Sequence, residues 1–468
     1  MHPLIAPLVL LSSILGADGD LPAGIQPYDW ALQQLHIPQA HETTRGSSDI
    51  IVAVIDLGYR HHPRLDGHLW TNPDPERGDI HGWDFHDDDA SLEYTGPGED
   101  SAYHRNHHVF VAGEVAAVAP ECRIMVLRVG YRSHDSWHRA IRYAVDHGAR
   151  VLVLPHGYIQ RAEGSDVPLF YQGTDFAYPE EYPELREAYD YAYDQGCLIF
   201  KGTADNRGRR AVFAQAAWET LCAVGSLDRH DRPADITNSA DYVEFAAPGG
   251  ARGTNDPAES VWGCAAEDGY CAFQGGCMAS GFAGGTAALI WSHFPDLTND
   301  QLRQILRNTA RQADGIEPDQ NGWDNQTGFG ILDAQAAVSL AADQLTRRVE
   351  WADPKATVTE DNGTGKLTGR LANRGVFDAN QAIAVVYNGN PRKPASPAAT
   401  VESPGPSLQV RQIGHVITPV RGLQEAAITI ELTEPPGQSL WVETYSLDRH
   451  DPGHLHRTEI AIPETAAE

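Results

Sequence analysis

The chain has 468 residues, a length that favours one large domain with a smaller one, or two domains of middling size. Hydrophobic residues make up 41% and charged residues 21% of the sequence, which excludes a collagen, a membrane bundle and a mainly disordered chain. The formal net charge is −29, so nucleic acid and anionic membranes are poor partners. We interpret this acidity as a solvated surface in preference to an acid-specific role.

The N-terminal segment is apolar. Residues 4–15 form the only long apolar run, and a small, polar stretch follows it. The run is too short to span a bilayer comfortably, so residues 1–19 are predicted to be a signal peptide, although the basic residues that usually precede such a run are missing. The alternative is an apolar tail. With a signal peptide the protein is expected to be secreted or periplasmic, with no membrane span after signal removal.

The central part of the chain alternates short apolar runs with longer amphipathic ones, which is typical of a parallel sheet with helices on its faces. We therefore expect a doubly wound α/β domain over residues 25–343, with its site beyond the carboxyl ends of the strands. Strands are predicted at residues 50–55, 124–129, 151–154, 197–200, 221–224 and 243–246, and helices at 136–147, 278–294 and 299–309.

The C-terminal part has another composition. Pro, Gly, Thr and Asn rise after residue 345, and short alternating runs such as residues 382–387 and 427–432 recur between turn residues. This pattern predicts an all-β sandwich over residues 348–468. It carries no catalytic constellation, so a structural or adhesive role is favoured over specific ligand binding.

The six cysteines are too few for a disulfide-built scaffold of this length. Export would allow some of them to pair. Cys264 and Cys271 flank six residues, a spacing that a hairpin can close, and a disulfide between them is predicted.

Three segments carry residues suited to catalysis. Asp56 stands at the carboxyl end of an apolar strand, where an aspartate alone is often only a helix cap. His107 begins a helical segment of small residues, and Cys277 lies in a glycine-lined turn that opens an Ala-rich helix. Each of the three sits where a strand ends or a helix begins.

In this order the segments resemble the subtilisin-like peptidase family over about residues 25–343. Residues 54–58 match the family's aspartate motif, residues 107–113 match His-Gly-Thr-His-Val-Ala-Gly, and residues 275–281 align without gaps on Gly-Thr-Ser-Met-Ala-Ser-Pro. This alignment puts Cys277 at the position of the nucleophilic serine. The resemblance implies the fold of that family and hydrolysis of peptide bonds in a polypeptide substrate.

The resemblance also implies a role for each residue. Cys277 would be the nucleophile, His107 the general base and acid, and Asp56 the group that orients the imidazole. Asn206, in an Asp-Asn-Arg-Gly turn, matches the family's oxyanion asparagine and would bind the oxyanion together with the backbone N–H of Cys277. A thiolate forms readily at a helix N-terminus beside an imidazolium, so a resting Cys277/His107 ion pair is predicted.

The sequence departs from the family at several positions. His108 and Phe110 replace a glycine and a histidine, while Gly276 and Gly281 replace the threonine before the nucleophile and the proline after it. Each change affects the fine geometry of the site.

The substrate-binding strand is altered as well. The residues expected to bind substrate are Leu154, Pro155, His156 and Gly157. Because proline has no N–H, one main-chain hydrogen bond to an extended substrate is expected to be lost, and His156 is expected to narrow the pocket. A harmless edge-strand proline is the equal alternative.

No metal ligand is assigned from the sequence. The family's calcium-binding insertion after the catalytic histidine is missing, because residues 115–120 lead straight into the next strand, so that calcium site is expected to be lost. Asp84, Asp87, Asp88 and Asp89 offer four carboxylates that would suit a cation, but a solvated turn is favoured. No other cofactor is predicted.

Three functions remain open at this stage. The favoured one is a secreted endopeptidase with an Asp-His-Cys triad. The alternative is a catalytically inactive pseudoprotease that binds peptides or a partner, favoured by the altered motif positions and by the lack of room for an inhibitory propeptide before Asp29. The third makes Cys277 a structural or redox-labile thiol, with adhesion carried by the β-sandwich.

Overall fold

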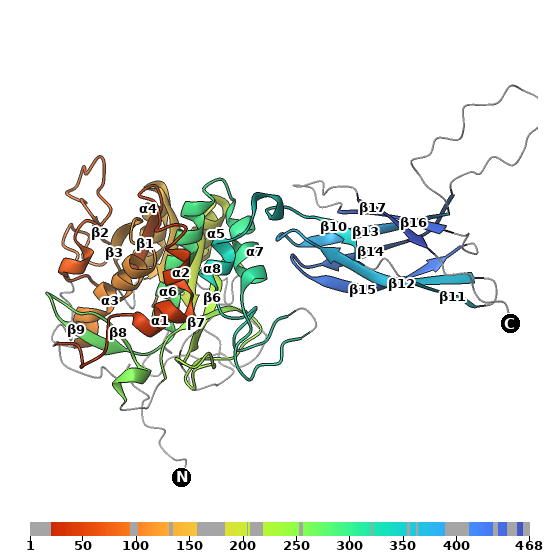
Figure 1. Ribbon diagram of the computed structural model, residues 1–468. Helices are drawn as coiled ribbons and strands as arrows, with labels where there is room; N and C mark the ends of the chain where they lie inside the picture. Colours follow the sequence, from red (N-terminus) through yellow and green to blue (C-terminus); the bar gives the residue numbers. More distant parts are fainter. Residues whose placement is uncertain are drawn as a thin grey trace, which may run out of the picture. The chain divides into compact units, whose positions relative to one another are not determined.

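The computed structural model describes residues 20–93, 102–130, 134–156, 183–203, 205, 219–251, 256–319, 322–352, 356–361, 364–388, 411–433, 439–446 and 456–461. The predicted signal peptide lies outside these residues. The chain divides into two compact units, Met1–Ser339 and Leu340–Glu468 (Figure 1). Within the part of the chain that the structure describes, no helix has the length and apolar character that a bilayer crossing requires.

The first unit contains a seven-stranded sheet with the order β2-β3-β1-β4-β5-β6-β7, and every neighbouring pair in it is parallel. Its strands are β1 (Ile51–Asp56), β2 (Gly82–Asp84), β3 (Arg123–Arg128), β4 (Ala149–Leu154), β5 (Leu198–Gly202), β6 (Cys222–Leu227) and β7 (Val243–Pro248). The predicted α/β class is confirmed. The sequence pattern missed β2, which has only three residues and forms the edge of the sheet.

Helices cover both faces of this sheet, as Figure 1 shows. The helices described in this unit are α1 (Asp29–Gln34), α2 (Ile37–Ala40), α3 (Ala102–Val118), α4 (His134–Asp146), α5 (Pro183–Asp194), α6 (Gly276–His293), α7 (Asn299–Thr309) and α8 (Ala334–Val338). Helices α3 and α6 pack on one face, and α4 and α5 on the other. Helix α6 is buried over almost its whole length, which explains its Ala- and Gly-rich sequence.

Two strands of the sheet matter for the site. In β1, Ala53 and Ile55 pack in the cluster that contains α4 and α5, so Val52, Val54 and Asp56 face the side of α3 and α6. In β4, Leu154 belongs to the α4/α5 cluster. Because side chains alternate along a strand, Asp56 at the end of β1 faces α3 and α6, while Leu154 at the end of β4 faces α4 and α5.

A separate two-stranded hairpin joins β8 (Val261–Cys264) and β9 (Tyr270–Phe273). In its register Cys264 pairs with Tyr270, while Gly263 pairs with Cys271. Because neighbouring residues of a strand point to opposite faces, the side chains of Cys264 and Cys271 leave the hairpin on opposite sides. Neither cysteine is part of a disulfide, so the predicted disulfide is wrong although the hairpin forms.

The four carboxylates at residues 84–89 include three that arginines engage. Arg128 donates through Nη1 to Asp84 and to Asp87, the latter at 2.6 Å, and Arg139 Nη2 lies 2.6 Å from Asp88 Oδ1. Asp84 and Arg128 are fully buried. Asp87, Asp88 and Asp89 are exposed, as the predicted solvated turn requires, whereas the buried Asp84 is paired with Arg128.

The second unit consists of two antiparallel sheets that share one hydrophobic core. Strands β10 (Val349–Trp351), β11 (Thr357–Asp361), β12 (Thr364–Asn373) and β15 (Glu425–Leu432) form one sheet. Strands β13 (Ala379–Asn388), β14 (Arg411–Val420), β16 (Ser439–Ser446) and β17 (His456–Ala461) form the other. This is the predicted all-β sandwich architecture.

A buried ion cluster ties α7 to β7 and gives a test of the fold. Glu244 accepts hydrogen bonds from Arg303 Nε at 2.7 Å and from Arg307 Nε at 2.6 Å, and its side chain is only 5% exposed.

Removing one partner of a buried ion pair typically costs about 3–5 kcal/mol. Arg303→Met should therefore lower the free energy of unfolding by about 3 kcal/mol in denaturant titrations. Arg186→Met, which removes a half-exposed pair with Asp190 within α5, should change it by less than about 1 kcal/mol, and equal losses would contradict this account.

Candidate active site

A buried hydrogen bond connects the first two predicted catalytic residues. Asp56 ends β1 on the face that α3 covers, and His107 lies in the first half of α3. His107 Nδ1 lies 2.7 Å from Asp56 Oδ2, and both side chains are at most 1% exposed. Since an ionised carboxylate only accepts, Nδ1 carries the proton and donates it, which leaves the lone pair of the ring on Nε2.

The charge on Asp56 is held by its neighbours. Burial alone would raise the pKa of this carboxyl group, but its interaction with His107, including the hydrogen bond from Nδ1, outweighs burial and holds the pKa well below its usual range. The backbone N–H of Leu57 also donates to Asp56 Oδ1, at 2.8 Å. Asp56 is therefore a stable anion that fixes the orientation of the imidazole.

Cys277 is the second residue of α6, and its side chain is partly buried. Its Sγ donates to the backbone oxygen of Pro155 at 3.1 Å. The Sγ atom, one ring nitrogen of His107 and one of His156 all lie within 4.8 Å of one another. The structure thus brings the three predicted catalytic side chains together, with the thiol turned toward Pro155.

The surroundings of Cys277 oppose the predicted resting ion pair with His107. Burial, together with the nearby carboxylates of Asp205 and Asp56, raises the pKa of the Cys277 thiol well above its usual value, and the positive charge of Lys201 only partly opposes this effect. A protonated thiol also accounts for the hydrogen bond to Pro155, because a thiolate has no proton to donate. These surroundings favour the neutral thiol of Cys277.

His156 places a second imidazole beside His107. The ring centroids of the two histidines are 4.1 Å apart. His156 Nε2 lies 2.9 Å from the Tyr103 hydroxyl and 3.5 Å from Asp56 Oδ1. Burial is the main effect on His156 and lowers its pKa well below the usual value, which favours the neutral ring. The sequence identified His156 only as a residue that narrows the pocket.

The predicted substrate-binding segment is only partly described. Pro155 and His156 lie beside Cys277, whereas the Leu154 side chain is fully buried in the cluster with α4 and α5 and faces away from it. Gly157 and the predicted oxyanion residue Asn206 lie outside the described residues. A substrate contact made by the backbone of Leu154 stays a prediction.

A buried lysine supports this segment. Lys201, in β5, is 2% exposed and donates through Nζ to the backbone oxygen of His156 at 2.6 Å. Burial lowers the pKa of Lys201 to about 7. The hydrogen bond fixes the chain immediately after β4, where Pro155 accepts from the thiol.

Asp205 is a site residue that the sequence reasoning missed. Its carboxylate accepts from the backbone N–H of Gly276, with Oδ1 at 3.0 Å and Oδ2 at 3.1 Å. Gly275 has a φ of 144°, and a Cβ atom there would lie 2.5 Å from Asp205 Oδ2, so only glycine fits this approach. The available signal was an aspartate immediately before the expected oxyanion residue. Asp205 ties that part of the chain to the N-terminus of α6.

Comparison with known families agrees with this arrangement. Residues 47–330 match the subtilase family model. The chain belongs to the subtilase family. The match spans β1, α3 and α6, and therefore includes Asp56, His107 and Cys277.

Curated relatives of this subtilase share about a quarter to a third of the aligned residues. Fervidolysin of Fervidobacterium pennivorans is 28% identical over 66% of this chain and 43% of its own length. A thermophilic serine proteinase of Bacillus sp. (strain AK1) is 30% identical over 62% of this chain and 63% of its own length. This subtilase thus spans less than two thirds of the length of either relative.

Solved structures agree in fold. The crystal structure of a lanthipeptide protease aligns with 69% of this chain and with 99% of its own chain. The TM-score is 0.53 at 20% identity. A protease of Pseudoalteromonas arctica covers 65% of this chain, is covered to 93%, and gives a TM-score of 0.51 at 23% identity. At these identities the likeness concerns the fold of the first unit.

A second buried acid, Glu114, lies behind the nucleophile helix. It is fully buried in α3, and neither carboxyl oxygen has a hydrogen-bond partner among the described residues. Glu114 packs against Gly281 of α6, where a Cβ atom would collide with Oε2. The replacement of the family proline by Gly281 thus makes room for this side chain. No sequence pattern singles out Glu114, because an acid on a small-residue helix looks like a solvent-facing one.

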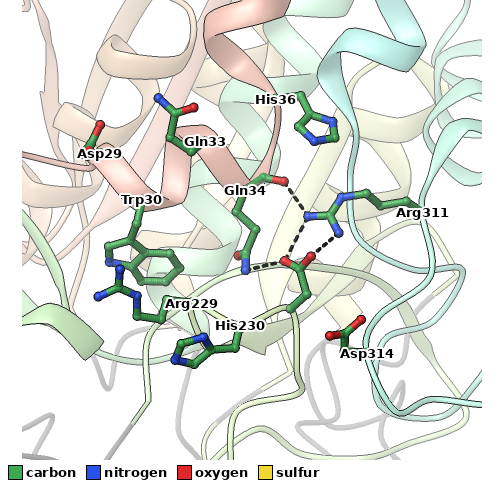
Figure 2. Close-up of a pocket in the computed structure, with 10 residues that line it drawn as sticks. Asp29, Trp30, Gln33, Gln34, His36, Arg229, His230, Arg311 and Asp314 are labelled. Carbon is green, nitrogen blue, oxygen red and sulfur yellow. Dashed lines mark hydrogen bonds and ion pairs between the residues drawn. The ribbon is translucent and has the colours of Figure 1, made fainter.

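The cavity drawn in Figure 2 is a different feature. It has a volume of about 700 Å³, and its lining includes no triad residue. Arg311 and Asp231 form an ion pair on one wall, and Gln34 binds both of them, with its backbone oxygen 2.7 Å from Arg311 Nη2 and its Nε2 2.8 Å from Asp231 Oδ1. Arg311 and Asp231 thus neutralise each other on this wall.

Glu114 gives a pH-dependent prediction. Burial raises the pKa of Glu114 well above its ordinary value of 4.5, so the folded chain keeps the proton while the unfolded chain releases it above that pH. Wild type should therefore lose stability, relative to Glu114→Gln, as pH rises from about 4.5 toward 8, by about 1.4 kcal/mol for each pKa unit involved. Thermal unfolding of both proteins at pH values of about 4 and about 8 measures this. A pH-independent difference would show that Glu114 ionises in the fold as it does in the unfolded chain.

Proposed function

We propose that this subtilase is an endopeptidase that hydrolyses polypeptides through a cysteine in place of serine. Cys277 is the nucleophile, His107 the general base and acid, Asp56 the orienting carboxylate, and Asn206 an oxyanion donor. The buried 2.7 Å hydrogen bond between Asp56 and His107, with Cys277 Sγ a short distance from the imidazole, is the observation that supports this proposal best.

The reaction begins from the neutral thiol. Substrate binding beside Pro155 competes for the backbone oxygen that holds the thiol, and Sγ–H turns toward His107 Nε2. The imidazole takes the proton while sulfur forms a bond to the scissile carbonyl carbon. Because the proton moves as the S–C bond forms, the mechanism needs no preformed thiolate. Asp56 stabilises the resulting imidazolium.

The tetrahedral intermediate then carries a negative oxygen. The N-terminus of α6 and the backbone N–H of Cys277 stabilise it, together with the Asn206 side chain. When the C–N bond breaks, His107 returns its proton to the leaving amine, and a thioester remains. Water, deprotonated by His107, attacks the thioester carbon, and the departing sulfur regains the proton as the carboxylic acid product leaves.

Polypeptides are the proposed substrates, and we propose that the enzyme acts outside the cytoplasm. One relative, from Natrialba magadii, is named as a halolysin-like extracellular serine protease and is 29% identical over 67% of this chain. The apolar residues 4–15 are consistent with export. An acidic surface with a net charge of −29 fits a protein that binds neither nucleic acid nor anionic lipid.

A second function has one observation in its favour. The thiol donates to Pro155, and His107 Nε2 has no hydrogen-bond partner among the described residues. A site held in this state would bind peptides or a partner protein without cutting them. The two functions differ in one measurable property, the turnover of an unfolded protein substrate.

The thiol decides between them. Purified wild type is expected to cleave an unstructured protein and to be blocked by a thiol-directed peptide inhibitor, while Cys277→Ala loses all cleavage. Cys122→Ala is the matched control and should keep activity. Cys122 is a buried cysteine whose Sγ forms a hydrogen bond with the Ser292 hydroxyl. Cleavage that survives in Cys277→Ala would show that another group attacks. Inert wild type with an active Cys277→Ser variant would establish the pseudoprotease.

The orienting role of Asp56 has its own test. Asp56→Asn replaces an acceptor with an amide that can present N–H to His107, which favours the wrong tautomer. For the equivalent change in a serine peptidase kcat falls by about 10⁴-fold, and we expect a similar loss here with KM changed much less. Kinetics on a chromogenic peptide, with circular dichroism to verify folding, give the answer, and a loss confined to KM would assign Asp56 to substrate binding.

A further inference from the structure

Three side chains with metal-binding atoms meet at the site from different elements. His107 comes from α3, His156 from the segment after β4, and Cys277 from the start of α6. One ring nitrogen of each histidine and Sγ of the cysteine lie within 4.8 Å of one another. Two of the three side chains are deeply buried, at 1% exposure for His107 and 8% for His156. The triad alone does not require this second imidazole.

The donor set suits one class of ion. Two imidazole nitrogens and a sulfur favour borderline-soft ions such as Zn²⁺, whereas Ca²⁺ and Mg²⁺ take oxygen ligands. Zinc binds nitrogen at about 2.0–2.1 Å and thiolate sulfur at about 2.3 Å, which puts tetrahedral donor atoms about 3.5 Å apart. Side-chain movements of about 1 Å, including release of Sγ from Pro155, bring the donors to this spacing.

The surroundings of His107 prepare it as a ligand. Its Nδ1 donates to Asp56 at 2.7 Å, the carboxylate–histidine arrangement that orients metal-bound imidazoles. Its Nε2 is buried and has no hydrogen-bond partner among the described residues. A nearly fully buried nitrogen lone pair in a cluster with a thiol and a second imidazole therefore has an unmet need for a proton or a cation.

We propose that His107, His156 and Cys277 bind one Zn²⁺ ion, and that the bound ion inhibits the enzyme reversibly. Zinc displaces the thiol proton to solvent and forms a Zn–S bond, while the two imidazoles donate lone pairs. No electron is transferred. The ion occupies both the attacking sulfur and the nitrogen that must accept its proton. The binding stands on the geometry of the three ligands, and the inhibition rests on the proposed peptidase function.

The experiment measures binding first. Metal-free full-length protein is titrated with Zn²⁺ by calorimetry and, separately, with Co²⁺, whose absorption reports sulfur ligation. Wild type should bind one Zn²⁺ per chain, and His156→Ala and Cys277→Ser should each weaken binding at least about 10-fold. The Cys277→Ser variant should also lose the sulfur-to-cobalt band. His138→Gln, at a histidine of α4 bonded to Asp135, is the control and should bind like wild type.

Each outcome has a definite meaning. Equal zinc affinity in wild type and both ligand variants, with circular dichroism showing that all are folded, would overturn the site and assign the ion to surface groups. A Co²⁺ complex of wild type without a sulfur band would overturn it as well. Zinc binding by a wild type that cleaves nothing when metal-free would keep the site and reject the peptidase. Cleavage by the metal-free enzyme that added Zn²⁺ does not stop would refute the inhibition.

Discussion

The hydrogen bond between Asp56 and His107 joins the carboxyl end of β1 to α3, and the chemistry of the site depends on it. Burial removes both groups from water, so the carboxylate acts on the imidazole without competition from solvent. The bond sets which nitrogen of His107 keeps its lone pair. The same lone pair serves the base of the proposed hydrolysis and the ligand of the proposed zinc site, which is why the two states exclude each other.

Buried acidic and basic side chains lie next to helix α6 and to the segment that Cys277 contacts. Asp205 binds the first backbone N–H of α6, Glu114 lies against the middle of this helix at Gly281, and Lys201 supports the segment that accepts from Cys277. A carboxylate at a helix N-terminus is electrostatically favourable. The same negative charge makes a thiolate at Cys277 costly. These charges therefore favour a protonated sulfur at Cys277.

Much of the first unit follows from local pattern. Apolar runs such as residues 151–154 form buried parallel strands, because only a sheet covered on both faces buries every side chain of such a run. The three predicted catalytic residues were visible because each lies in a short recognisable motif, at the end of β1 for Asp56, within α3 for His107 and at the start of α6 for Cys277. The two-sheet sandwich follows from alternation between turn residues.

What the sequence did not reveal depends on contacts between distant segments. His156 contacts His107 only because the fold places the end of β4 beside α3. No local sequence pattern predicts the relative positions of these two segments. The room that Gly281 leaves for Glu114 is likewise a contact across two helices. The disulfide prediction failed for a simpler reason, since loop length alone does not tell on which face of a hairpin a side chain emerges.

The arginines bound to residues 84–88 have a consequence for how this corner of the sheet responds to its medium. A loop closed by a bound cation loosens when chelators or scarcity remove the ion. Here Arg128 and Arg139 are part of the chain, so their charge cannot be removed by chelation. The ion pair between Arg139 and Asp88 lies near the surface, so salt screens it. The ion pair between Arg128 and Asp84 is buried, so salt screens it much less. The positive charges that hold the β2 edge are therefore covalently part of the chain.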